Sequence, residues 1–255
     1  MSNHSHSNDE ERWAQFSNFK RQVINDNQTL SLRKEKEKMT VMKSDGKVKD
    51  VLPGEYHYDS LFPLNDLHAT PKYTEATEVK WISNKVTGKG SLKFPNEFNE
   101  TIKIEIGTSE FLSYYGVTIT NNRPNDTITL GMRHAIQDFN YSKDYLQEYI
   151  LSKKGNGGAG LERHAFSHVD CPMDSDNGIF VLAKFVDEEE SILHLTGFRI
   201  PLNHCILIPG YVIHINDYLK GTWRTMLSDA APIDYVFLEK EDKRFHFKFE
   251  DVSKI

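Results

Sequence analysis

The 255-residue sequence has no uninterrupted apolar run of about eighteen residues, so it predicts no membrane-spanning helix. The first dozen residues are polar and lack an apolar stretch, which argues against a secretory signal. Cysteine is scarce: Cys171 and Cys205 are too few for a disulfide framework, and we expect both to be free thiols in a cytoplasmic protein. Acidic residues exceed basic ones by 37 to 31, so bulk nucleic acid is not an expected partner.

The composition changes near residue 50. Apolar residues in the segment 13–32 recur at helical intervals, which indicates an amphipathic helix. Residues 33–38 read Arg-Lys-Glu-Lys-Glu-Lys, and we interpret them as a charged, partly disordered linker. The sequence therefore predicts an N-terminal region, residues 1–50, followed by one domain over residues 51–255.

The domain is predicted to be mainly β, with helix confined to its N-terminal half. Residues 101–106 alternate apolar and polar side chains, which is the pattern of a half-buried strand. One helix is expected after Ser142, ended by Gly155. The later candidate strands are short and closely spaced: 163–169, 178–185, 192–198, 205–209, 212–216, 222–227, 235–238 and 245–249. Because no crossover helices fit between them, we expect an antiparallel jelly roll or barrel, with the N-terminal helix and strands packed around it.

Three features of this β-rich half indicate a metal site. In His168-Val-Asp170 the imidazole and the carboxylate are two residues apart, so on a strand they project from one face. An apolar strand turns at Pro209-Gly210 and leads into a second strand that carries His214. Arg224 follows within another apolar-rich strand, where a guanidinium needs an anionic partner if it is buried.

This arrangement resembles the His-x-Asp…His…Arg signature of the non-haem iron(II), 2-oxoglutarate-dependent dioxygenases, over about residues 160–230. The resemblance implies a double-stranded β-helix, a form of jelly roll. It also implies that His168, Asp170 and His214 bind iron(II), and that Arg224 binds the distal carboxylate of 2-oxoglutarate. The expected function is then oxidation of a small molecule or a side chain with O2 as the second substrate.

The family's hydroxyl residue two positions after the arginine is Met226 here. Thr222 or Thr225 is the expected replacement, although Thr225 adjoins Arg224 and should project from the opposite face of the strand. Trp223, which also adjoins Arg224, is expected on the outer side.

Two other interpretations remain open from the sequence. The segment from Ile208 to Asn216 resembles the second motif of the broader cupin family, in which case His164, His168 and His214 would bind the metal without 2-oxoglutarate. On one regular strand His164 and His168 would share a face. The third interpretation is a non-catalytic jelly-roll module that binds a ligand. The oligomeric state is not indicated.

Overall fold

The computed structural model of the chain describes residues 20–23, 39–42, 48–51, 70–121, 128–129, 134–153, 155–228 and 233–251. These residues are mainly β, as predicted. The helices among them are α3 (Ser109–Ser113) and the π-helix η1 (Leu146–Ile150). Within the described ranges, no helix has the length and apolarity needed to cross a membrane.

The strands form two large sheets and one small sheet. The six-stranded sheet has the spatial order β1 (Lys20–Val23), β10 (His134–Tyr141), β17 (Gly221–Ser228), β12 (His168–Pro172), β15 (His204–Ile208) and β8 (Thr118–Asn121). The eleven-stranded sheet has the order β20 (Lys248–Asp251), β7 (Thr101–Ile106), β14 (Leu193–Arg199), β13 (Phe180–Phe185), β16 (Ile213–Ile215), β11 (Gly160–His164), β18 (Ile233–Lys240), β6 (Lys89–Lys93) and β5 (Lys80–Ile82), while β4 (Thr74–Ala76) pairs with β14 and β19 (Lys243–Arg244) with β18. The small sheet consists of β3 (Val48–Val51), β2 (Met39–Met42) and β9 (Ile128–Thr129).

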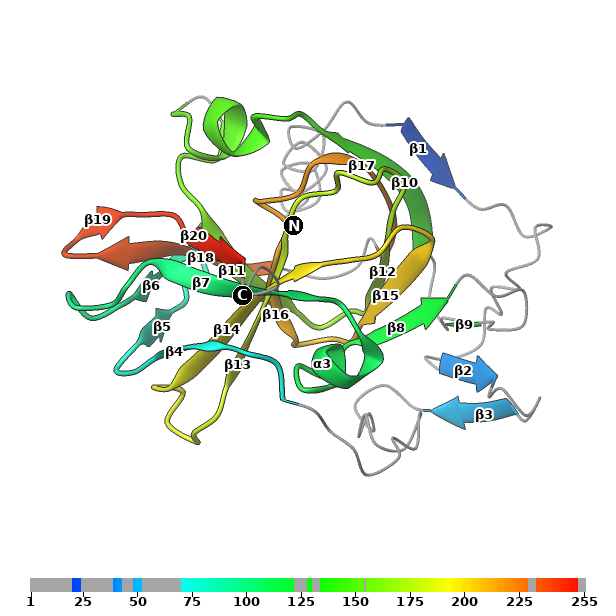
Figure 1. Cartoon of the computed structure of the whole chain (residues 1–255), viewed down its shortest axis with the longest axis horizontal. Helices are drawn as coiled ribbons and strands as arrows, with labels where there is room; N and C mark the ends of the chain where they lie inside the picture. Colours follow the sequence, from blue (N-terminus) through cyan, green and yellow to red (C-terminus); the bar gives the residue numbers. More distant parts are fainter. Residues whose placement is uncertain are drawn as a thin grey trace, which may run out of the picture.

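The chain crosses repeatedly between the two large sheets from β10 to β17. Strands β10, β12, β15 and β17 belong to the six-stranded sheet, and β11, β13, β14 and β16 belong to the larger one. In Figure 1 the first group curves around one side of a central space, and the second group lies on the other side. All pairings within these eight strands are antiparallel, whereas β6, β7 and β20 join the larger sheet through parallel pairings.

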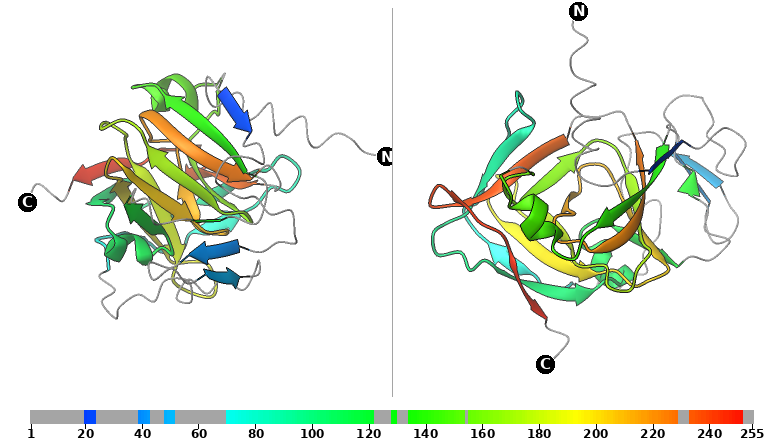
Figure 2. Two further views of the ribbon diagram at one scale, coloured as in Figure 1. Left: turned by 90° about the vertical axis from the view of Figure 1, so that its right-hand side faces the viewer. Right: turned by 90° about the horizontal axis from the view of Figure 1, so that it is seen from above.

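The hydrophobic core is formed by buried side chains from both large sheets. Figure 2 shows the arrangement of these sheets from two further directions. Among the fully buried members of the core are Phe180 and Phe198 of the larger sheet and Trp223 of the six-stranded sheet. The strand predicted at residues 101–106 is confirmed as β7. Along it, buried side chains alternate with more exposed ones. Trp223 is 1% exposed and faces the core, so the prediction that it lies on the outer side is wrong.

Several predicted elements differ in their limits. The helix expected after Ser142 is the shorter η1, and the Ser142 hydroxyl donates to Glu148 instead of capping the backbone. The predicted strand 163–169 is two strands, β11 and β12, in different sheets. Of the predicted helix 13–32, only Lys20–Val23 is described, and it forms strand β1. The rest of that segment and the linker 33–38 lie outside the described residues.

The two cysteines are joined by a disulfide, so the prediction of free thiols is wrong. Strands β12 and β15 pair Asp170 with Ile206, which puts the next residue, Cys171, opposite Cys205. Their Cα atoms are 4.4 Å apart, within the range that a disulfide spans. Thirty-four residues separate the two cysteines in the sequence, and only the register of the two strands brings them together.

Candidate metal centre

Three buried histidines converge between the two sheets. His164 ends β11, His168 begins β12 and His214 is the middle residue of β16. Each offers one ring nitrogen, and these nitrogens all lie within 4.8 Å of one another. The rings of His168 and His214 have centroids 4.8 Å apart, and His164 lies 5.0 Å from each. None of the three residues is more than 4% exposed.

His164 and His168 meet because the strand breaks between them. After His164 the chain leaves the larger sheet and enters the six-stranded sheet at His168. The His164 carbonyl accepts a hydrogen bond from the backbone of Tyr211, and the Phe166 ring stacks on the imidazole with centroids 3.8 Å apart. The two histidines therefore face each other from opposite sheets instead of lying side by side on one strand.

The turn at Pro209-Gly210 brings His214 to the same place. Gly210 packs against the Ala165 carbonyl with no room for a Cβ atom, so the turn can lie directly over the crossing between β11 and β12. Tyr211 completes the turn with a φ of 67°. Strand β16 then runs between β11 and β13, which confirms the prediction that the turn leads into a second strand carrying this histidine.

Hydrogen bonds fix the orientation of two of the imidazoles. The Nδ1 atom of His164 donates to the Phe166 carbonyl at 2.8 Å, and that of His214 donates to the Val212 carbonyl at 2.9 Å. In each ring this leaves Nε2 as the unprotonated nitrogen that can bind a metal. His214 Nε2 is buried against the Glu162 carboxylate, whereas His168 Nδ1 is buried and has no hydrogen-bond partner. A buried polar atom in that state costs about 1–3 kcal/mol, and a metal ion bound there would remove the cost.

Two carboxylates accompany the histidines. Glu162 lies two residues before His164 on β11, and its Oε1 atom is 3.2 Å from His214 Nε2. Asp170 lies two residues after His168 on β12, and its Oδ2 atom is 3.1 Å from His168 Nε2. The other oxygen of Asp170 accepts a hydrogen bond of 2.6 Å from the Thr225 hydroxyl.

The pKa values reflect the crowding of these buried groups. Burial, followed by the neighbouring His214 and His168, lowers the pKa of His164 to about 3. Burial alone would raise the pKa of Glu162, but its attraction to His214 and then to the other two histidines outweighs burial and lowers it to about 2. For His214, burial opposes the charged form, yet the pKa is raised because Glu162 lies against the ring. An ionised Glu162 and a neutral His164 are the states suited to binding a cation.

The structure brings together three of the residues that the iron(II) resemblance implies. His168 and His214 lie in the cluster, and Asp170 lies beside His168. His164, which belongs to the cupin interpretation, completes the group of converging nitrogens. Sequence reasoning missed Glu162, although its spacing from His164 puts both side chains on one face of a strand.

Arg224 and Thr222 are not brought to the cluster. Strand β17 turns Thr225 toward Asp170, so Arg224 projects from the opposite face and is exposed. Its guanidinium donates two hydrogen bonds to Asp138, of 2.7 and 2.9 Å. Thr222 shares this outer face with Arg224 because it lies two residues before it on the strand.

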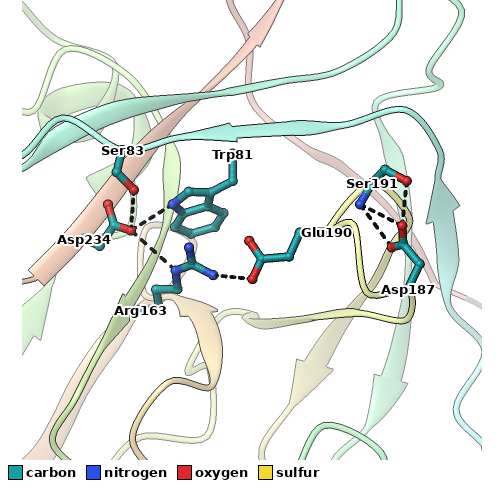
Figure 3. Close-up of polar contacts among 7 residues, drawn as sticks. All are labelled: Trp81, Ser83, Arg163, Asp187, Glu190, Ser191 and Asp234. Atoms are coloured by element: carbon teal, nitrogen blue, oxygen red, sulfur yellow. Dashed lines mark hydrogen bonds and ion pairs between the residues drawn. The ribbon is translucent and has the colours of Figure 1, made fainter.

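The outer side of β11 is held by a separate set of contacts, shown in Figure 3. Arg163 precedes His164 and points away from it, with its guanidinium 4.5 Å from the centre of the Trp81 ring. The same side chain donates to Asp234 at 3.4 Å and to Glu190 at 3.0 Å. These contacts fix the strand from which His164 projects inward.

Comparisons of the chain with protein-family models, with curated proteins and with solved structures find no match. The class of site is therefore defined by its own geometry: three buried imidazoles that could hold one metal ion, with a carboxylate against two of them.

Proposed function

We propose that this chain is a metal-dependent oxidoreductase in which His164, His168 and His214 hold one iron(II) ion. The observation that carries the proposal is the convergence of three buried imidazole nitrogens within 4.8 Å. Imidazole is a ligand that suits iron, zinc, copper and nickel. When bound, iron(II) on three protein ligands supplies further coordination positions at which O2 and a substrate can react.

The path of the chain supports a double-stranded β-helix as the fold that carries this site. The eight strands β10 to β17 divide equally between two facing sheets, with the hairpin of β13 and β14 at the midpoint. The three histidines come from β11, β12 and β16, so ligands contributed by both sheets meet in the interior.

The surrounding residues have supporting roles in this proposal. Asp170, fixed by the Thr225 hydroxyl, orients the His168 ring through its Nε2 atom. The Val212 carbonyl orients the His214 ring, and Glu162 supplies negative charge beside the Nε2 atom that would bind the ion. Phe180 lies parallel to the His214 ring with centroids 6.0 Å apart. This apolar contact limits the access of water to one side of the centre.

A second candidate function keeps 2-oxoglutarate as a co-substrate, with Asp170 as a metal ligand in place of His164. One observation favours it: the Asp170 carboxylate is buried beside His168, from which it lies two residues away on the same face of β12. The outward position of Arg224 leaves the co-substrate without the cation that the family resemblance implies. The three-histidine centre without 2-oxoglutarate is therefore the function that the geometry supports better.

Metal uptake by the full chain tests the proposal. The metal-free protein is dialysed anaerobically against iron(II), and bound iron is counted by elemental analysis. We expect one ion per chain, a rise in melting temperature on loading, and no further rise with N-oxalylglycine, a mimic of 2-oxoglutarate. The variant His204→Ala serves as a control because His204 lies on β15 and bonds the Leu202 carbonyl, outside the cluster.

Absence of iron uptake would contradict the proposal and favour a non-catalytic module. Additional stabilisation by N-oxalylglycine that depends on iron would favour the second candidate instead.

A further inference from the structure

Three ionisable side chains outside the histidine cluster form a hydrogen-bonded chain near the start of β14. The phenol oxygen of Tyr114, the residue that follows α3, lies 2.6 Å from His194 Nδ1. The other ring nitrogen of His194, Nε2, lies 3.1 Å from a carboxylate oxygen of Glu75. The register of β4 and β14 brings Glu75 there, because it pairs directly with His194. We refer to Tyr114, His194 and Glu75 as the tyrosine triad.

The carboxylate determines which ring nitrogen of His194 carries the proton. The Glu75 carboxylate accepts hydrogen bonds and does not donate them, so the neutral imidazole donates to it from Nε2. Nδ1 is then the acceptor, and the Tyr114 hydroxyl donates to it. A nucleophile, a base within hydrogen-bond reach and a third group that orients the base are the arrangement that activates hydroxyl nucleophiles.

Two further side chains surround the triad. The Tyr73 ring stacks on the imidazole of His194 with centroids 3.7 Å apart, which holds the plane of the base. Lys184 pairs with His194 across β13 and β14, and its ammonium group lies 4.7 Å from the centre of the Tyr114 ring. A positive charge at this place stabilises the negative charge that develops on the phenol oxygen as its proton leaves.

The phenol is the part of the triad that a small molecule can reach. His194 is 7% exposed, whereas Tyr114 is only half-buried and the neighbouring Lys184 is exposed. Burial, followed by the nearby Tyr73 and Glu75, raises the pKa of Tyr114, so free phenolate is scarce near neutral pH. The nucleophile therefore has to form as the proton passes to His194, which is general-base catalysis.

We propose that Tyr114 is a nucleophile that takes an acyl group from an activated ester, with His194 as its general base and Glu75 as the positioning residue of that base. The phenol oxygen bonds to the carbonyl carbon of the ester, and the phenol proton passes to His194 Nδ1. The bond from that carbon to the leaving oxygen breaks, and the leaving group departs as an anion; nothing is oxidised or reduced. The step uses no residue of the metal centre, so it goes beyond the proposed function.

The ester p-nitrophenyl acetate tests this step. The full chain is incubated with it near neutral pH in the presence of EDTA, so that no metal-bound hydroxide takes part. Released p-nitrophenolate is followed by its absorption, and the acetylated residues are mapped by mass spectrometry. Tyr73 is the internal comparison, because it is also half-buried and the structure shows no base bonded to its hydroxyl among the residues it describes. We expect a burst of about one p-nitrophenolate per chain, and acetylation of Tyr114 at least about 100-fold faster than that of Tyr73.

Variants assign the nucleophile and the base. Tyr114→Phe keeps the ring but removes the nucleophile, and should abolish the burst. His194→Gln keeps a hydrogen-bonding side chain but removes the base, and should slow the acetylation of Tyr114 about 100-fold.

The positioning role of Glu75 needs its own readout. Glu75→Leu removes the acceptor for Nε2, so the ring 15N chemical shifts of His194 should show both tautomers in place of one. The acetylation of Tyr114 should slow about tenfold. Glu188→Leu is the matched control, because Glu188 is exposed between β13 and β14, and it should change neither measurement.

Acetylation of Tyr114 no faster than that of Tyr73 overturns the proposal, as does a burst that persists in Tyr114→Phe. An unchanged rate in His194→Gln removes the general base. A single, unchanged tautomer in Glu75→Leu removes the positioning role. All of these measurements are made without metal, so their failure leaves the metal centre untouched.

Discussion

His164 is the residue that separates a three-histidine centre from a His-x-Asp centre, so its replacement is the most informative perturbation. In His164→Ala the cluster keeps His168 and His214 but loses the third nitrogen. Apparent zinc affinities of about 10–16 kcal/mol in four-ligand sites indicate about 2.5–4 kcal/mol for each ligand. We therefore expect the metal dissociation constant to rise by about 100-fold to 1,000-fold.

The thermal stability of the loaded protein reports this change. At a metal concentration 100 times its dissociation constant, binding stabilises the unmodified chain by about 2.7 kcal/mol. A 100-fold weaker site gains only about 0.4 kcal/mol at the same concentration. For a chain of this size 1 kcal/mol corresponds to about 2–4 °C, so the metal-dependent rise should fall from about 5–11 °C to at most about 2 °C.

The assay compares each protein with and without metal, so any cost of the substitution to the metal-free fold cancels. It is done at pH 7.5, where His164 is neutral both in the folded protein, with its pKa of about 3, and in the unfolded chain. His204→Ala is the control and should keep the full rise. An equal metal-dependent rise in His164→Ala and in the unmodified chain would refute the role of this histidine.

The remaining predictions concern the neighbours of the cluster. Asp170→Asn keeps an acceptor for Thr225 but removes the charge beside His168, and should weaken metal binding about 10-fold to 100-fold in a competition titration; an unchanged affinity would argue that Asp170 has no role in orienting the ring. Arg224→Ala breaks only an exposed pair, so it should cost less than about 1 kcal/mol on denaturant unfolding and leave metal loading unchanged; loss of an N-oxalylglycine effect in this variant would instead restore a co-substrate role for Arg224. Burial raises the pKa of Asp217 to about 8, so the folded state favours the protonated acid, and the contribution of this group to the stability of the metal-free chain should decline by up to about 6 kcal/mol as pH rises from about 4 to about 8. The lowered pKa of His164 acts in the opposite direction below about pH 6.5, so the decline is measured as the difference between the unmodified chain and its Asp217 variant. Asp217→Asn should flatten that decline in urea unfolding, and parallel stability curves for the two proteins would contradict the assignment.

The sequence predicted the β-rich character because it is a local feature, and it pointed to His168 and His214 in the iron(II) interpretation and to all three histidines in the cupin interpretation. Alternation of apolar and polar residues identified β7, and Pro209-Gly210 identified the turn before His214. The cluster itself depends on a break that the sequence does not mark. Residues 165–167 read Ala-Phe-Ser, without the glycine, proline or asparagine that usually indicates the end of a strand.

The prediction of which face of β17 points into the interior is wrong for a different reason. Assigning Arg224 to the interior followed from the family resemblance, and it forced Trp223 to the outside. The physical preference is the reverse, because burial of a tryptophan is favourable and burial of a guanidinium requires an anionic partner. The disulfide lay beyond sequence reasoning altogether, since the register between β12 and β15 is a tertiary property.

X-ray absorption at the metal edge of the loaded full chain identifies the residues that bind the ion. We expect three imidazole ligands with metal–nitrogen distances of about 2.0–2.1 Å, and the loss of one of them in His164→Ala. A first coordination sphere with two imidazoles and the carboxylate of Asp170, unchanged by that substitution, would contradict it.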